Sequence, residues 1–326
     1  MGRDFSPQGL MRKNRLGMRK AFGVWLEEMA EEYDDLFVIA ADVASSANLQ
    51  GFAERYPDKF LNIGIAEQNM AGVAAGLAKE GSNVFIVSFA PFVTMRAYEG
   101  LRTLAGYMRL NVKAVALSSG FSLGVQGSTH YCLEDISLVK TIPGLLVLSP
   151  ADCLAEGRCL EYLMGYKGPA FLRLTGVDGS PAVYRKDFEL DMSGRPHLLR
   201  EGEDIVLLGT GAVLSEGVRL ARALKGDGLS CAVYDAEVLK PLALADLQEQ
   251  FRTAKLVVTL EEHFRTGGLG DIVAAELAAL PGHAPLLKFG VPDLFPKAGD
   301  YAYMLEECGL NAPRMRGAVL EALSRA

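Results

Sequence analysis

The sequence lacks the features that mark several specialised classes of protein. No stretch approaches eighteen uninterrupted apolar residues, so we expect no membrane-spanning helix. The five cysteines form no CxxC pair and show no zinc-like spacing with histidine, so we expect no metal site. Because an odd set of unpatterned cysteines is typical of a reducing compartment, we expect a cytoplasmic protein.

An excess of basic residues is also absent. The 33 lysines and arginines are outnumbered by 40 aspartates and glutamates, which gives a net charge of -7 and argues against nucleic acid as a partner. Basic residues gather only near the start, at Arg3, Arg12, Lys13 and Arg15. This segment has no apolar core of the kind that a secretory signal needs, so we expect residues 1–17 to form a flexible tail.

Apolar runs that alternate with amphipathic segments are what the sequence does contain. Strands are predicted at 36–41, 60–63, 83–89, 112–119, 145–149 and 170–174. Strands separated by helices imply a doubly wound parallel sheet with right-handed crossovers. The periodicity lapses between about 177 and 202 and then resumes. We therefore predict an α/β fold with a larger domain at 18–190 and a smaller α/β C-terminal domain at 191–326.

One segment joins a short strand to a helix of small residues that carries a single carboxylate, Glu67. The strand at 60–63 is expected to be buried, and the helix that follows has one apolar stripe, made of Ala66, Met70, Val73 and Leu77. A glutamate in a first helical turn commonly does no more than complement the helix dipole. The small residues around it, including Gly72 and Gly76, would let the helix lie close to a neighbouring backbone or subunit.

Further polar and aromatic side chains follow the ends of the predicted strands, where open parallel sheets bind ligands. They are Asp42, Glu67, Phe89, Phe92, His130 and Arg173. A helix is predicted at 91–108, and aromatic residues at helical spacing are usually core. Arg173 stands out, since an arginine inside an apolar strand needs an anionic partner, either a structural carboxylate or a substrate phosphate.

The string GIAEQNMAGVAAGLA at residues 64–78 resembles, nearly letter for letter, the pyrimidine-binding domain of transketolase-like thiamine diphosphate enzymes. The resemblance extends over most of the chain. It implies that Glu67 is catalytic and shares a proton with a ring nitrogen of the cofactor, which a carboxyl group in an apolar cleft is suited to do because its pKa is raised. Protonation of the pyrimidine favours its imino tautomer, and that form can take the proton from the thiazolium carbon.

The resemblance also assigns roles to other residues. It implies cofactor contacts from Asp42, Ile65, Phe89, Phe92 and Tyr98, and Met95 stands where a further aromatic is common. It implies that His130, in GSTH where the family has GPTH, contacts the sugar and acts in catalysis. It also implies that Arg173, Arg19 and either Ser45 or Ser46 bind the substrate phosphate. Two family residues that read sugar hydroxyls, an aspartate and a histidine, are replaced by Gln126 and Ser118. The donor and acceptor therefore stay open, including a nonstandard ketose or a related acyloin transfer.

The family's diphosphate-binding signature, GDG followed by an asparagine pair, is missing. Gly226-Asp227-Gly228 lies in a predicted turn of the second domain without the asparagines, which indicates a chance match. The resemblance therefore implies the C-terminal subunit of a split transketolase. A separate N-terminal subunit would hold the diphosphate and Mg²⁺ or Ca²⁺, the assembly would be a dimer of heterodimers, and a two-carbon ketol unit would pass from a ketose phosphate to an aldose phosphate.

Other functions stay open at this stage. The same domain occurs in 1-deoxyxylulose-5-phosphate synthase-like enzymes and in the β subunit of 2-oxo acid dehydrogenases. The β subunit typically lacks the IAEQN motif. A non-catalytic assembly subunit could keep the fold without the chemistry. Cys132, two residues from His130, would suit a thiol nucleophile only if a third group oriented the pair.

Overall fold

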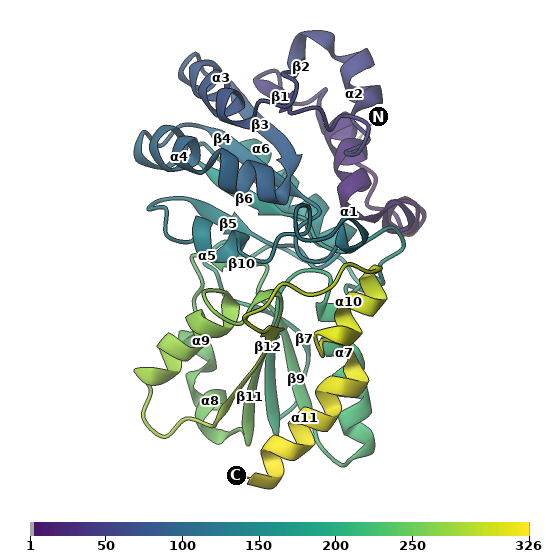
Figure 1. Cartoon of the computed structure of the whole chain (residues 1–326), viewed down its shortest axis with the longest axis vertical. Coiled ribbons are helices and arrows are strands. Elements are labelled where there is room, and N and C mark those ends of the chain that lie inside the picture. The colour runs from purple at the N-terminus through teal and green to yellow at the C-terminus, as the bar shows by residue number, and fades with distance from the viewer. Residues whose placement is uncertain (1–2, 326) are drawn as a thin grey trace.

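Two sheets, one from each half of the chain, frame the computed structural model, which describes residues 3–325 (Figure 1). The first has the strand order β10-β5-β6-β4-β3-β1-β2. In that order its strands are Val238–Lys240, Leu146–Leu148, Ala170–Arg173, Val112–Leu117, Asn83–Phe89, Leu36–Ala40 and Phe60–Asn62. All neighbours except β10 and β5 pair in parallel.

Helices cover both faces of this sheet because its central strands are apolar on both sides. The helices of this domain are α1 (Pro7–Met29), α2 (Gln50–Arg55), α3 (Glu67–Lys79), α4 (Tyr98–Gly100), α5 (Asp135–Val139) and α6 (Cys153–Gly165). Val38 packs with residues of α1 and α6 in one core cluster, whereas its neighbour Ile39 packs with residues of α3 and α5 in another. This alternation across the sheet confirms the predicted doubly wound α/β architecture.

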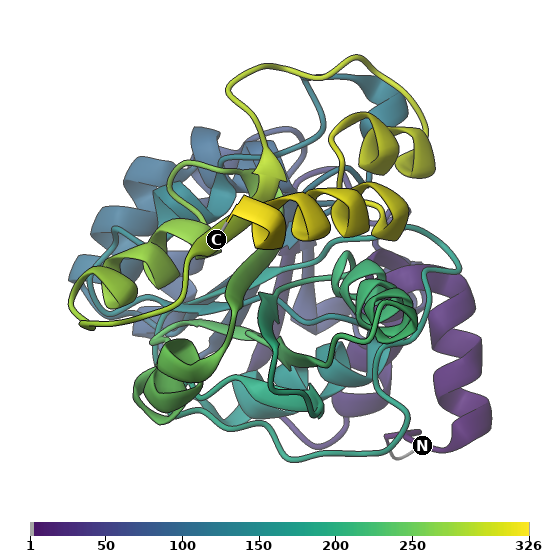
Figure 2. The same cartoon turned by 90° about the horizontal axis from the view of Figure 1, so that it is seen from below.

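The second sheet has the order β12-β11-β8-β9-β7, with strands Leu286–Val291, Leu256–Phe264, Ile205–Gly209, Cys231–Asp235 and His197–Arg200. Its helices are α7 (Leu214–Gly226), α8 (Gln248–Thr253), α9 (Leu269–Ala278), α10 (Tyr301–Glu307) and α11 (Ala312–Arg325). Seen from below, α9 and α11 lie on different sides of the sheet (Figure 2). No helix or strand lies in residues 174–196, which connect the domains.

The short strand β10 comes from the C-terminal half of the chain but belongs to the first sheet. Val238 pairs with Leu148 in antiparallel register, and the Ser149 amide donates to the Glu237 carbonyl at 2.7 Å. The two domains therefore share a sheet edge.

The expected flexible tail at residues 1–17 is wrong for most of its length, because α1 begins at Pro7. Ser6 caps the helix by accepting a hydrogen bond from the Gly9 amide. Lys13, one of the basic residues that suggested a solvated tail, is buried, with its ammonium 2.9 Å from a carboxylate oxygen of Glu28 and 3.7 Å from the ring centre of Trp25. Met1 and Gly2 lie outside the described residues.

Two other elements differ from expectation. The strand predicted as buried at 60–63 is β2, an edge strand whose Leu61 and Asn62 are exposed, because only β1 flanks it. The helix predicted at 91–108 is broken into two π-helical segments, Phe92–Arg96 and Leu101–Tyr107, on either side of α4. Such wide turns change which side chains share a face, and they occur often at functional sites.

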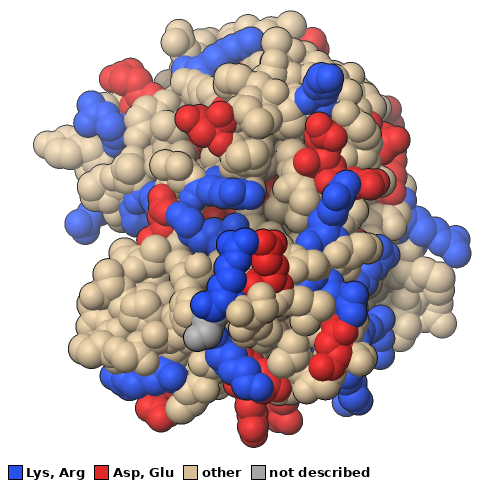
Figure 3. Space-filling view, turned by 60° about the horizontal axis from the view of Figure 1, so that its bottom comes forward, with Lys and Arg blue, Asp and Glu red and all other residues tan. Residues whose placement is uncertain are grey.

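The surface carries charges of both signs. On the face drawn in Figure 3, basic and acidic side chains lie side by side over much of the view. Within residues 3–325, no helix combines the length and the apolar character that crossing a membrane requires.

Candidate active site

Glu67 lies in the first turn of α3, as predicted, and its side chain is only 4% exposed. The Ser88 hydroxyl, on β3, is 3.5 Å from Oε1. Arg96 is the closer neighbour, because its Nη1 lies 3.3 Å from each carboxylate oxygen. A buried carboxylate whose closer polar partner is a half-exposed side chain can bind a ligand that takes that partner's place.

Three rings lie together at this edge of the sheet, and one of them, Phe92, contacts the same arginine as the carboxylate. His130 lies 5.6 Å from the ring centre of Phe92 and 6.3 Å from that of Phe89, and the two phenylalanines are 6.3 Å apart, all in edge-on geometry. Phe89 ends β3, Phe92 opens the following π-helical turn, and His130 lies in the loop after β4, with Nδ1 2.9 Å from the Thr129 hydroxyl. The structure thus brings together Phe89, Phe92 and His130, and Arg96 connects this cluster to Glu67, as expected for residues that the sequence placed at one sheet edge.

Arg96 completes this group, and sequence reasoning missed it. Its guanidinium lies 4.0 Å from the ring centre of Phe92 and also faces Glu67. Its side chain is 49% exposed. From the sequence alone it is indistinguishable from an ordinary solvated helix residue. Phe92 and Arg96 are the two ends of one π-helical turn, and this turn places the guanidinium over the ring of Phe92. An arginine directly after an aromatic strand-to-helix segment is the only sequence signal that points to it.

Other predicted residues lie at the same edge without contacting this group. Asp42 is exposed, has a left-handed backbone (φ 58°), and its amide donates to the Asn62 side chain at 3.2 Å. Ile65 is 74% exposed just before α3, and Ser45 is exposed in the loop after β1. Gln126 is exposed in a 3-10 turn, Gly124–Gln126, four residues before His130. These side chains are free to meet a ligand or a second chain.

Tyr98 is not brought into the group. Its hydroxyl lies 2.8 Å from that of Thr141 and donates to the Leu138 carbonyl at 3.2 Å, so it fastens α4 to the segment around α5. The π-helical turns on either side of α4 change the spacing that would have aligned Tyr98 with Phe92.

Arg173 is not a phosphate ligand in this structure, which corrects the role that the resemblance implied. Its side chain is fully buried, with Nε 2.7 Å from Asp135 Oδ2, and Nη2 donates to the Glu262 carbonyl at 2.6 Å. Its anionic partner is the structural carboxylate, the other option that the sequence left open. Because Glu262 belongs to β11, Arg173 joins the two domains.

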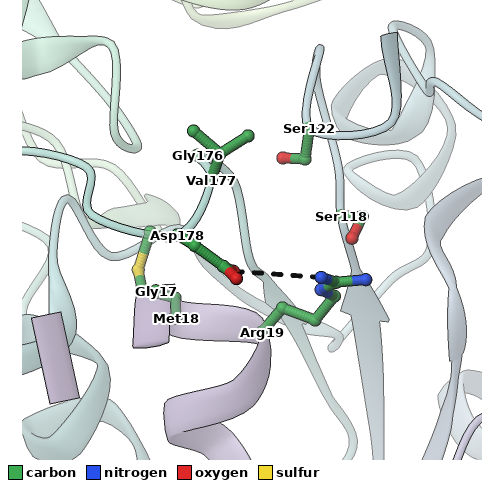
Figure 4. A pocket seen from close by; sticks show the side chains of 8 residues that line it. All are labelled: Gly17, Met18, Arg19, Ser118, Ser122, Gly176, Val177 and Asp178. Atoms are coloured by element: carbon green, nitrogen blue, oxygen red, sulfur yellow. Dashed lines mark ion pairs between the residues drawn. The ribbon is translucent and has the colours of Figure 1, made fainter. Parts of the chain in front are cut away.

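A pocket of about 190 Å³ opens beside this edge, and Arg19 lines it (Figure 4). It is formed by the kink in α1, by Ser118 and Ser122 after β4, and by residues 176–178 after β6. Gly17 makes the kink with φ 71°, and a Cβ at this position would come within 2.8 Å of the Val177 carbonyl oxygen. Because strands β3, β4 and β6 are neighbours, the pocket lies along the same edge as Phe89.

Two minor sequence features have no place in this site. Cys132 is fully buried, and burial raises the pKa of its thiol well above its usual value, so it is unsuited to act as a nucleophile. Asp227 of the GDG string lies at the end of α7 and forms an ion pair with Arg316.

Comparisons with known proteins place both domains. Residues 14–176 match the model of the transketolase pyrimidine-binding domain, and residues 194–315 match that of the transketolase C-terminal domain. A protein of Methanocaldococcus jannaschii, provisionally named a transketolase C-terminal section, is 34% identical over 95% of this chain and 97% of its own length. A 6-deoxy-6-sulfo-D-fructose transketolase subunit of a Clostridium species is 33% identical over 94% of this chain and 95% of its own.

A solved structure is also similar. A split-gene transketolase, described as an inactive β4 tetramer, superimposes with a TM-score of 0.85 at 35% identity, over 95% of this chain and 99% of its own.

Proposed function

Because this chain belongs to the transketolase family and corresponds over its length to the C-terminal subunit of the split members, we propose that it forms half of a thiamine diphosphate-dependent ketol-transfer site. A separate N-terminal subunit supplies the other half. The observation that carries the proposal is the buried Glu67 carboxylate, which Arg96 links to the ring cluster of Phe89, Phe92 and His130. Membership of the family implies the cofactor, and these residues fit its pyrimidine ring.

The fit is chemical as well as spatial. Aromatic walls suit a flat heteroaromatic ring, and a buried carboxyl group can share a proton with a ring nitrogen. Arg96 now contacts both surfaces that the ring would use, the Phe92 face and the Glu67 carboxylate. We infer that Arg96 swings outward when the ring enters, which its half-exposed position allows.

When bound, the cofactor supplies the carbon centre that carries the two-carbon unit. The protein's own part is to hold and move protons. Glu67 would exchange a proton with the ring nitrogen, His130 would face the sugar from the loop after β4, and the burial of Glu67 would keep water from its carboxylate. The pocket at Arg19 receives the far end of the sugar. The diphosphate and a divalent cation, Mg²⁺ or Ca²⁺, are assigned to the partner subunit.

The outer face of α3 supports the need for a partner. A Cβ at Gly72 or Gly76 would meet no atom within 4 Å, so this face of the helix is open to a second chain. Ile65 is exposed at the same end of the helix as Glu67. A β4 tetramer of the similar split-gene enzyme is inactive, which is the behaviour expected of a half-site. We propose a dimer of heterodimers with the site at the contact between unlike subunits.

The experiment that tests the function is a titration of this chain with thiamine diphosphate and Mg²⁺, alone and mixed with the N-terminal subunit from the same organism. Cofactor binding is measured by calorimetry. Activity is measured as ketol transfer from xylulose 5-phosphate to an aldose phosphate. We expect weak binding and no transfer alone, and both on mixing. Tight binding and transfer by this chain alone would contradict the shared site.

Replacing Phe92 with leucine should weaken cofactor binding to the mixed subunits about tenfold. Leucine keeps most of the apolar volume but not the ring face, and aromatic contacts contribute about 0.5–1.5 kcal/mol beyond burial. The matched control is Phe295→Leu, since Phe295 is an exposed aromatic of the C-terminal domain that packs edge-on against Phe264. Equal affinities in the two variants would mean that Phe92 does not contact the cofactor.

A further inference from the structure

The pocket at Arg19 contains a charge that a phosphate-binding site would not be expected to hold. Among its eight lining residues, Arg19 is the only cation and Asp178 the only anion. The two side chains point toward each other across the pocket, one from α1 and one from the loop after β6 (Figure 4). Asp178 Oδ1 lies 3.9 Å from Arg19 Nη2.

The position of Asp178 is fixed from two sides. Lys20, the residue after Arg19, forms a close ion pair with the other carboxylate oxygen of Asp178. The left-handed residue Gly17 brings the start of the second segment of α1 against the backbone of residues 177 and 178. The carboxylate is therefore held at the pocket by the fold, although its side chain is 47% exposed.

The remaining polar groups of the pocket are uncharged. Ser118 stands at the end of β4 with a left-handed backbone (φ 58°), and Ser122 donates its hydroxyl to the Ser119 carbonyl at 2.8 Å. A serine hydroxyl can both donate a hydrogen bond to a sugar hydroxyl and accept one from it, so it does not require an anionic ligand. Arg19 is thus the only lining group that attracts a phosphate, and Asp178 is already its partner.

We propose that Asp178 sets the charge preference of this subsite. A carboxylate beside the only lining arginine repels a phosphate dianion and competes with it for the guanidinium. Although Lys20 leaves the three charges with a net positive sum, Asp178 weakens the binding of a phosphate relative to that of a hydroxyl-terminated sugar. Asp178 therefore narrows the preference for a phosphate over a hydroxyl group at the end of the sugar remote from the reacting carbonyl. This inference rests on the proposed function, because it concerns the sugar site of the same enzyme.

The test uses this chain assembled with its N-terminal subunit, thiamine diphosphate and Mg²⁺. The ratio of kcat/KM for D-ribose 5-phosphate to that for D-ribose is measured with one ketose donor, for the native complex, Asp178→Asn and Asp178→Glu. Asparagine removes the negative charge at nearly constant shape, so we expect the ratio to rise about tenfold, through KM for the phosphate ester. Glutamate keeps the charge and should keep the native ratio.

Two controls separate a charge effect from a structural one. Asp58→Asn removes an exposed carboxylate at the other end of the domain and should leave the ratio unchanged. The effect of Asp178→Asn should shrink between 0.05 and 0.5 M salt because the subsite is partly open to solvent, and screening at these concentrations weakens charge interactions. A change in packing would not depend on salt in this way.

A direct binding measurement keeps the test independent of turnover. Calorimetry with D-ribose 5-phosphate should give about tenfold tighter binding to the Asp178→Asn complex than to the native one. If no ketol transfer is found with either sugar while this difference in binding persists, the proposed reaction fails and the role of Asp178 stands. An unchanged ratio together with unchanged binding, or a fall in either, overturns the role of Asp178.

Discussion

Glu67→Gln should lower turnover by the assembled subunits about a hundredfold or more while leaving the assembly and its cofactor content unchanged. Glutamine keeps the size of the side chain and its burial in α3 but cannot exchange a proton with a ring nitrogen, and general acid–base catalysis typically contributes a factor of about 10² to 10⁴. The measurement is kcat for ketol transfer, with the subunit ratio determined by size-exclusion chromatography and light scattering.

The matched control for this variant is Glu80→Gln, at the other end of the same helix. Glu80 caps α3, is exposed, and should tolerate the same change with a native rate. Native turnover in the Glu67 variant would rule out the acid–base role and would favour a non-catalytic assembly subunit. A variant that no longer assembles would be followed by Glu67→Asp, which keeps the charge.

Arg173→Ala should lower the free energy of unfolding by about 3–5 kcal/mol, the usual cost of removing one partner of a buried ion pair. The variant leaves the Asp135 carboxylate and the Glu262 carbonyl buried without their donor. Denaturant unfolding followed by fluorescence measures the loss. The control Arg195→Ala removes an exposed ion pair with Asp191 and Asp246, which should change stability by about 1 kcal/mol or less.

A double variant distinguishes burial from function at Arg173. Arg173→Met with Asp135→Leu replaces both charges with apolar groups of similar volume and should recover much of the lost stability. If Arg173 instead bound the substrate phosphate, Arg173→Ala would raise KM for phosphorylated sugars at native stability. That result would contradict the buried pairing.

The fold could be predicted largely from local patterns. Apolar strands separated by helical periodicity predict a parallel sheet flanked by helices, and both domains have this arrangement. The short strands β7 and β10 were not, because three or four residues carry almost no periodic signal and their pairing partners lie far along the chain. The burial of Lys13 cannot be predicted locally for a similar reason, because its ammonium pairs with Glu28 across the kink in α1.

The sequence predicts the carboxylate and the aromatic residues of the site but not Arg96 or Asp178. Glu67 and the two phenylalanines follow strand ends that must meet at one edge, so topology alone brings them together. The partner of Arg173 could not be chosen from sequence, because Asp135 and a phosphate satisfy the same guanidinium. Arg96 and Asp178 needed three-dimensional information, the first from a π-helical turn and the second from the contact of a kinked helix with a loop.

The strand β10 has a consequence for how the molecule is made. Because Val238–Lys240 closes the first sheet against β5, that sheet stays incomplete during synthesis until the ribosome has released residues well beyond the connecting segment 174–196. Until then the apolar strand Leu146–Leu148 is an unprotected edge, the kind of surface that pairs with other chains. In Figure 1 the two domains look like independent halves of the molecule. A chain cut in the connecting segment would nonetheless leave the first domain with an exposed, aggregation-prone edge, so this domain depends on residues of the second for its last strand.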